Sequence, residues 1–400
     1  MEGLKLHPHL QQLHRTSLLD DQSTYKKLEL NKKRNEEQDH SAMIDEATSH
    51  FQYEDCRNEY WNPEEFSLLY GTPVWDQASP SQRIILNQLY WVAYYAQIIS
   101  AEIATIYLNQ VSAAGLYTYE DFRIVCDSLD LETKQERAHI NAFKTIGEDV
   151  EWRLFGERIF TYPMRSLYEH TMVFPDRNPA ENFWRKMQIK AFTLMSSDNA
   201  FLASQYLLVR GLRTLTGKLV QHKLSHYYTS HQDKDNAPIP AKISYYHFMD
   251  ESFHFNTSKI IGHEIPRSLE PPTPFEIWVI NRAVAGCQKD HFPFSTTIKG
   301  IFWYEPSLFG ALYKVFQSKH FGMSESEAKH MLAQCFTRDS EGVSQAFAVH
   351  QTALESYKAY VDSISYLDRR NRDMLIMGSN SIPKYLAQNA RALRTFRGEV

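Results

Sequence analysis

The residues of this sequence that are best suited to chemistry are glutamate and histidine side chains, and two pairs of them share one spacing. Glu136 and His139 form a Glu-x-x-His pair, and Glu251 and His254 form a second one. Residues three positions apart lie on the same face of a helix, so each pair can present a carboxylate and an imidazole together. Helical proteins use these two groups to bind iron and manganese. Each pair is therefore a candidate for binding one metal ion.

Each pair follows a segment that carries a single acidic residue among apolar residues. Glu102 precedes the first pair and Asp198 precedes the second, and both have apolar neighbours at helical spacing. His247 lies one helical turn before Glu251, on the same predicted face. The sequence thus predicts four helices that turn acidic residues toward their apolar sides, in the order acid, pair, acid, pair.

Two other Glu-x-x-His pairs have a simpler interpretation. Glu37 and His40 lie in a polar stretch, and Glu327 and His330 lie in a charged helical segment. Exposed ion pairs are common in such surroundings and contribute little to stability. We interpret both as solvated surface pairs.

Electrostatics explains why the acids of the four apolar helices would lie together. Buried carboxylates cost several kcal/mol each unless cations compensate them. Two divalent metal ions would balance four carboxylates. One acid from each of two helices and a Glu-x-x-His pair from each of the other two is the pattern of ferritin-like dimetal carboxylate proteins.

The elements that must position these residues are helices, because β-branched residues in alternating runs are scarce. We predict an all-α, ferritin-like helical bundle with additional N-terminal and C-terminal helices. Ser79 and Pro80 mark the start of the first long helix as a cap and a first-turn proline. The third helix is predicted to run on through Gly211, with a kink there. The predicted core helices span residues 80–114, 120 to beyond 143, 179–228 and 240–261.

The chain is predicted to form one catalytic domain. Residues 1–50 are polar and form an N-terminal extension that is helical or partly disordered. Residues 51–400 form the single helical domain, with the metal-binding core at 80–262 and further helices at 275–400. The stretch 231–240 is predicted to be a linker.

Composition excludes several other classes. The net charge is −5 and basic residues are scattered, which argues against nucleic acid as a partner. No apolar run reaches the roughly 18 residues of a membrane span, so we expect no membrane association. The four cysteines are far apart, which favours a reducing compartment and a cytoplasmic location.

At the level of these motifs, the sequence resembles the AurF-type diiron oxygenases, whose founding activity is N-oxygenation of p-aminobenzoate. The segment WVAYYAQIISAE resembles the first ligand helix of that family. ERAH at 136–139 resembles its first Glu-x-x-His pair, and HFMDESFH at 247–254 resembles the second pair with the family's additional histidine. The third ligand helix of the family carries a glutamate. This sequence has no glutamate between Glu181 and Glu251, so Asp198 is the residue that it offers at that place.

The resemblance implies a dinuclear non-haem iron site, with manganese as the alternative metal and O2 as co-substrate. It also implies an external electron donor and a small or carrier-bound organic substrate; a homodimer is compatible with the sequence. Cyanobacterial fatty-acyl halogenases are relatives of this family. The implied ligands are Glu102, Glu136, His139, Asp198, His247, Glu251 and His254.

Three functions stay open at this stage. The first is O2-dependent N-oxygenation of an amine. The second is C–H functionalisation of a fatty-acyl chain, by halogenation, hydroxylation or desaturation, at the same site. The third is a non-catalytic iron-handling protein. A carboxylate at Asp198 that is shorter than the family's glutamate would leave a coordination position open to an anion.

Five further residues are candidates for the surroundings of the site. Glu132, one turn before Glu136, is either an extra ligand or base, or a solvated residue. Asp250 is a candidate partner that orients a ligand histidine. Tyr94 and Tyr95 either line a substrate pocket or pack in the core. Arg210 either anchors a substrate carboxylate or is a surface ion.

Overall fold

The computed structural model describes residues 15–160, 179–298, 306–372 and 381–398. These residues form helices connected by turns and contain no strand, which confirms the predicted all-α class. No helix among them is both long and apolar enough to cross a membrane.

Helices α5 (Pro80–Leu116) and α6 (Arg123–Phe155) form the first pair of the bundle. Ser79 caps α5 as predicted: its side chain accepts from the backbone N–H of Gln82, and the Gln82 side chain accepts from the backbone N–H of Ser79. Helix α6 ends at Gly156, whose φ of 71° is the left-handed conformation that glycine adopts without strain.

Helices α9 (Ala200–Thr229) and α10 (Ile239–His263) form the second pair and pack along most of their length. Their backbones come close at Gly262, where an added Cβ would lie 2.8 Å from the backbone of Leu208. A glycine is therefore required at this crossing. The linker predicted at 231–240 lies between the two helices.

The predicted third helix is wrong in one respect, because it consists of two helices. Helix α8 (Pro179–Ser196) ends before a turn, and α9 begins after it. Asn199 has extended backbone angles, and its side chain accepts from the backbone N–H of Leu202, which caps α9. No break occurs at Gly211, which lies inside α9 and leaves room for the hydroxyl of Tyr360.

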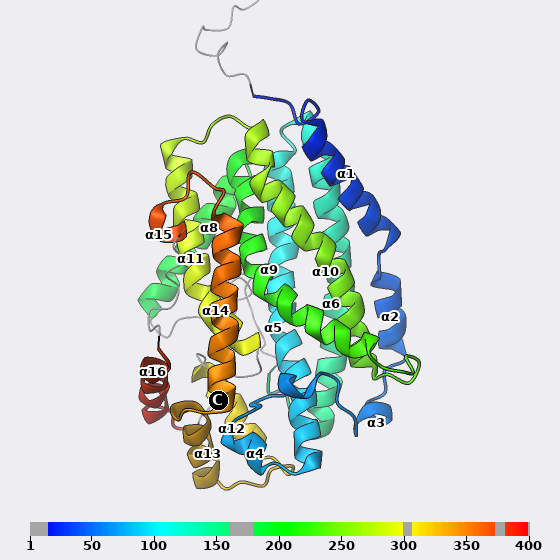
Figure 1. The fold of residues 1–400 in the computed structure, drawn as a ribbon, viewed down its shortest axis with the longest axis vertical. Coiled ribbons are helices and arrows are strands. Elements are labelled where there is room, and N and C mark those ends of the chain that lie inside the picture. Colours follow the sequence, from blue (N-terminus) through cyan, green and yellow to red (C-terminus); the bar gives the residue numbers. More distant parts are fainter. Residues whose placement is uncertain (1–14, 161–178, 299–305, 373–380, 399–400) are drawn as a thin grey trace, which may run out of the picture.

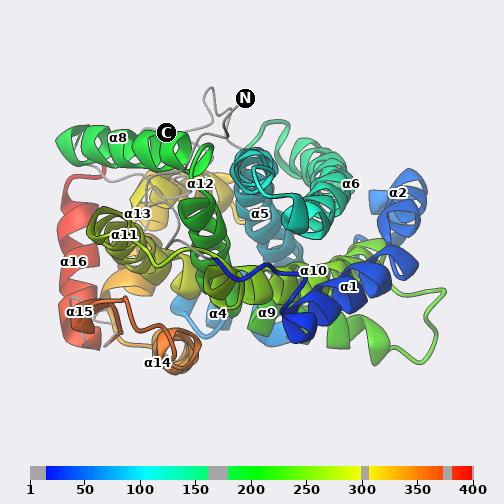
Figure 2. The same ribbon diagram turned by 90° about the horizontal axis from the view of Figure 1, so that it is seen from above.

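The polar N-terminal segment is helical from residue 22. Helices α1 (Gln22–Glu37) and α2 (Ser41–Ser49) pack against α6 and α10 along one side of the bundle. The C-terminal helices cover the opposite side, and α11 and α14 contact α9 there (Figures 1 and 2). The remaining elements are α3 (Tyr53–Cys56), η2 (Glu64–Phe66), α4 (Pro73–Gln77), η3 (Glu120–Phe122), η4 (Ile265–Ser268), α11 (Pro274–Ile298), α12 (Pro306–Gln317), α13 (Glu325–Thr337), α14 (Glu341–Val361), α15 (Arg369–Arg372) and α16 (Ile382–Arg394).

Two apolar clusters fill the bundle at different levels. One contains Trp91 and Phe143, and the other contains Leu129 and Leu208, all of them buried. On α5, α6 and α10, the candidate ligands lie in the segments between these clusters. The bundle thus encloses a polar band between two apolar layers, which positions the candidate site.

Candidate metal centre

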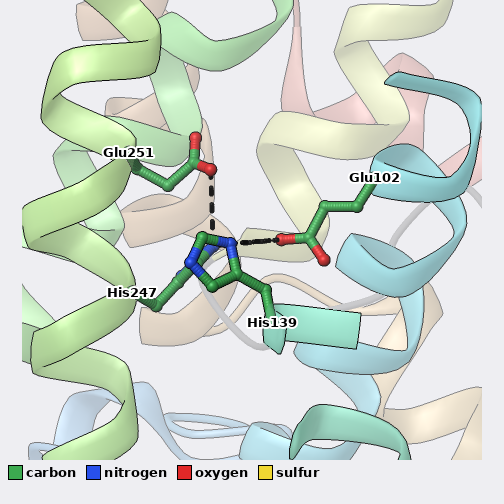
Figure 3. A group of neighbouring side chains, drawn as sticks. All are labelled: Glu102, His139, His247 and Glu251. Carbon is green, nitrogen blue, oxygen red and sulfur yellow. Dashed lines mark hydrogen bonds and ion pairs between the residues drawn. The ribbon is translucent and has the colours of Figure 1, made fainter. Parts of the chain in front are cut away.

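Six buried or nearly buried side chains from three helices converge in the polar band. Each residue of a group can offer one nitrogen or oxygen, and the atoms offered by a group lie within 4.8 Å of one another. Figure 3 shows four of the residues, with Glu102 on α5, His139 on α6 and two residues on α10. The first group is Glu102, His139, His247 and Glu251, and the second is Glu136, Glu251 and His254.

The first group is centred on the imidazole of His247. Its Nε2 lies 3.1 Å from Glu102 Oε1 and 3.7 Å from Glu251 Oε1. His139 Nδ1 lies 3.7 Å from the same Glu102 oxygen. One carboxylate from α5 and one from α10 therefore face two imidazoles across the bundle.

The second group is centred on the imidazole of His254. Its Nδ1 lies 2.9 Å from Glu251 Oε1 and 3.4 Å from Glu136 Oε1. The other oxygen of Glu136 lies 3.5 Å from His139 Nδ1. Glu251 belongs to both groups and Glu136 reaches an imidazole of each, so both carboxylates lie where they could bridge two metal ions.

The outer nitrogens of two histidines are held by hydrogen-bond acceptors. His139 Nε2 lies 3.1 Å from Asp250 Oδ2, and His254 Nε2 lies 2.9 Å from Gln135 Oε1. An acceptor at Nε2 keeps the proton on that nitrogen and leaves the lone pair of Nδ1 directed into the site. Asp250 is thus placed to orient a ligand histidine.

The charges of the cluster shift several pKa values. Burial and the neighbouring Glu136 raise the pKa of Glu102. Burial alone would raise the pKa of Glu136 too, but His139 and His254 hold it well below its usual range. Burial alone would lower the pKa of both histidines, yet the surrounding carboxylates raise it well above 6.5. Protons on the imidazoles therefore compensate the carboxylates, and metal binding would displace them.

The residues present fit a dimetal centre. Three atoms that face the cluster are buried and have no hydrogen-bond partner among the described residues: Glu102 Oε2, Glu136 Oε2 and His139 Nδ1. Unpaired buried polar groups are costly, and a metal ion would satisfy all three. Carboxylate and imidazole donors suit iron or manganese. The donor set can hold two divalent ions.

Asp198 is not part of this cluster, which corrects the sequence-based expectation. It lies in the turn between α8 and α9 and is exposed. The prediction assumed a continuous helix there, with Asp198 on its apolar face. Because the helix ends at Ser196 and Asn199 caps the next one, Asp198 has no helical face to occupy.

The inward position of α9 at the level of the site is Gly217. Arg210 of α9 donates to the backbone oxygen of His254, and His222 contacts the ring of Phe248, so the residues between them lie level with the α10 ligands. Gly217 is two helical turns after Arg210 on the same face. It is buried, and a Cβ added there would meet no atom of the described residues within 4 Å.

Arg210 and Glu132 form a buried ion pair beside the site. Arg210 Nη2 lies 2.7 Å from Glu132 Oε2, and the two side chains are 6% and 0% exposed. The guanidinium also donates to Asn109 Oδ1 and Ser258 Oγ. Burial alone would lower the pKa of Arg210, but Glu132 raises it above its ordinary value. Arg210 is thus neither a surface ion nor free to anchor a substrate carboxylate, and Glu132 is not solvated.

The tyrosines of α5 pack against the site from one apolar layer. Tyr95 stacks on Phe143 with ring centroids 4.0 Å apart and lies edge-on to His247 at 5.6 Å. Its hydroxyl donates to Ser244 Oγ. Tyr94 is equally buried and stacks on Tyr90. Both side chains shield the polar band from solvent on this side.

Sequence reasoning missed four residues around the site. Gln135 carried a weak signal, as a polar neighbour of Glu136 on the helix that carries the first pair. Gly217 carried none, because a glycine inside a helix has many explanations. Asn35 and His40 belong to the segment that we interpreted as an extension, yet they contact Gln135 and Asp250. The interpretation of His40 as part of a solvated pair is therefore wrong, because its ring packs against the buried Asp250.

Comparison with known proteins gives one match. A family model described as acyl halogenase, CylC-like, matches residues 23–397. The match begins in α1, includes all four helices of the bundle and ends after α16. No curated protein and no solved structure matches the chain. The halogenase branch of the predicted resemblance is confirmed, whereas the N-oxygenase type is not.

Proposed function

The chain belongs to the CylC-like acyl halogenase family, a family of oxidative enzymes, and we propose that it catalyses halide-dependent functionalisation of a C–H bond in an acyl chain. The overall reaction consumes the C–H substrate, a halide ion, O2, two electrons and three protons. It yields the halogenated chain and two water molecules. The electrons come from an external donor, and the acyl chain is supplied free or on a carrier.

The observation that supports halide use is the absence of a carboxylate from α9. Glu102, Glu136 and Glu251 bring three negative charges to the cluster, whereas two divalent ions carry four positive ones. The nearby Glu132 is already paired with Arg210. A charge balance of this kind leaves a place for one more anion. The space beside Gly217, on the helix that offers no carboxylate, is where we place it.

The residues of this chain then have separate roles. The carboxylates and the inner nitrogens of His139, His247 and His254 would bind the two metal ions. When bound, redox-active ions such as iron or manganese supply O2 activation and oxidising power. Asp250 orients His139. The layer of Tyr95 and Phe143 keeps water away from one side of the site, which protects reactive species from side reactions.

The proposal is tested on the full chain loaded with iron(II) under anaerobic conditions. Fatty-acyl substrates, a reductant and O2 are added with chloride or bromide, and the products are analysed by mass spectrometry. We expect products with the isotope pattern of the halide supplied. The variant Gly217→Glu places a carboxylate in the open position, so it should keep both metal ions and O2 uptake but lose at least nine-tenths of the halogenated product, roughly a 1.4 kcal/mol effect on partitioning.

Gly286→Glu is the matched control, because Gly286 is a helical glycine on α11 that also has no described atom within 4 Å of an added Cβ. It should halogenate like the parent. Hydroxylated or desaturated chains without halide would show C–H oxidation but no halide use. Conversion of p-aminobenzoate in the same assay would instead favour N-oxygenation. Metal uptake without any product would favour an iron-handling protein.

A further inference from the structure

The helices α1 and α2, here called the N-terminal arm (residues 22–49), reach the metal centre through hydrogen bonds. The arm packs against α6 and α10, which carry the two Glu-x-x-His pairs. Asn35 lies near the end of α1 and is 2% exposed, and His40 precedes α2. Each of them contacts the side chain that holds the outer nitrogen of one ligand histidine.

Asn35 forms a closed pair of hydrogen bonds with Gln135. Asn35 Nδ2 donates to Gln135 Oε1 at 3.1 Å, and Gln135 Nε2 donates to Asn35 Oδ1 at 2.9 Å. The pair fixes the plane of the Gln135 amide with its oxygen 2.9 Å from His254 Nε2. His254 must then donate from Nε2, so its Nδ1 is free to bind metal.

His40 acts on the other pair through Asp250. Its Nδ1 lies 2.8 Å from Asp250 Oδ1, and its backbone N–H donates to the same oxygen at 3.3 Å. The second oxygen of Asp250 faces His139 Nε2. The His40 ring also stacks on Tyr246, which holds it against α10. Asp250 is thereby held by His40 of the arm at one carboxylate oxygen and by the ligand His139 at the other.

Other contacts also hold the arm against the bundle. Asn31 of α1 donates to the backbone oxygen of Phe253 and to Thr257 Oγ1, and Lys27 pairs with Glu264 at 2.8 Å. Those bonds join α1 to α10 and its C-terminal end without touching a ligand. The bonds of Asn35 and His40 differ because they end on groups that orient metal-binding imidazoles.

We propose that Asn35 and His40 are positioning residues of the dimetal centre, so that the N-terminal arm sets the geometry and basicity of His254 and His139. The inference rests on the metal centre of the proposed function. The two imidazoles are held differently, one by a neutral amide and one by a carboxylate. A carboxylate partner makes an imidazole the more basic ligand, so the two metal positions are unequal, and the arm holds both partners in place.

Cobalt(II) is the probe for the test, because its visible spectrum reports ligand geometry without any turnover. Metal-free full-length chain is titrated anaerobically, and affinities are measured by competition with a chelator. Loss of the group that directly holds a ligand histidine weakens metal binding by about 10- to 100-fold, and this range is the upper limit for residues that act through such a group. We expect weaker binding within this limit at one position in Asn35→Leu and at the other in His40→Ala, each with a changed cobalt spectrum. His40→Asn keeps a donor near the place of Nδ1 and should restore binding.

The matched controls are Asn31→Ala on the same helix and His50→Ala at the end of α2, whose ring nitrogen contacts Glu46 and Ser49 of its own segment. Both should bind cobalt like the parent, and all variants should melt within a few degrees of Asn31→Ala when metal-free. If Asn35→Leu and His40→Ala keep the parental affinities and spectra, the positioning role is wrong while the metal centre stands. If the parent itself binds no cobalt, the metal centre is wrong, and the positioning role with it.

Discussion

The bundle consists of an α5–α6 half and an α9–α10 half. The second helices of the two halves, α6 and α10, are alike, whereas the first helices, α5 and α9, differ. Helices α6 and α10 both carry Glu-x-x-His, and both pairs face the same cluster. Their partners are unequal: α5 contributes Glu102, whereas α9 has Gly217 at the level of the ligands. The duplicated motif therefore does not imply a duplicated site, and the centre is one carboxylate short on the α9 side.

The α9–α10 half compensates with other groups. Helix α10 contributes His247 in addition to its pair, and Glu251 belongs to both ligand groups. Helix α9 contributes Arg210, which reaches across to Glu132 of α6. Helix α10 thus supplies three of the six candidate ligands, as many as α5 and α6 together, while α9 supplies a cation and open space. This asymmetry is what distinguishes the site from a bundle with four equivalent acids.

The largest expected effect comes from removing the shared carboxylate. Glu251→Ala should lose both metal ions, because Glu251 lies in both groups. Glu136→Ala should keep one ion in the group of Glu102, His139 and His247. Metal content per chain after dialysis against a chelator measures the difference. The control is Glu148→Ala. Glu148 lies on the same helix as Glu136, and its substitution removes an ion pair with Arg158 away from the cluster. Full metal content in Glu251→Ala would show that Glu251 is not a shared ligand of the two groups.

The second effect concerns the ion pair that joins the halves. Arg210→Met leaves Glu132 buried without a partner, and Glu132→Leu leaves Arg210 unpaired. Breaking a buried pair from one side costs about 3–5 kcal/mol, whereas replacing both partners by apolar residues is often neutral. Urea unfolding should therefore show two destabilised single variants and a double variant that recovers most of the loss. If the losses of the two single variants add up in the double variant, the ion pair does not account for the destabilisation of either single variant.

The smallest effects are expected in the turn before α9. Asn199→Ala removes the cap of α9 and should cost about 1 kcal/mol in the free energy of unfolding. Asp198→Ala changes an exposed side chain and should stay within about 0.5 kcal/mol of the parent. Both variants should load two metal ions. Loss of metal in Asp198→Ala would show that Asp198 is a metal ligand. The two halves would then both contribute an acid outside the Glu-x-x-His pairs.

The sequence by itself determined the features that depend on neighbours along one helix. The Glu-x-x-His spacing places each pair on one face wherever the helix goes, and Glu102 and His247 follow the same rule. Ser79 and Pro80 start α5 because a cap and a first-turn proline act within one turn. The all-α class follows in the same way from apolar periodicity. For this reason, six of the seven residues predicted as ligands lie on the helix faces that meet in the structure.

Only the tertiary structure decided which groups from different helices meet. The sequence pattern predicted Asp198 as the fourth acid, but Asn199 caps a new helix, and α9 takes a direction of its own after the break (Figure 2). Gly217 lies level with the α10 ligands because α9 and α10 run antiparallel in one particular register. Asn35 and His40 reach Gln135 and Asp250 across at least 100 positions of sequence. Such contacts depend on the packing of whole helices, which no local pattern encodes.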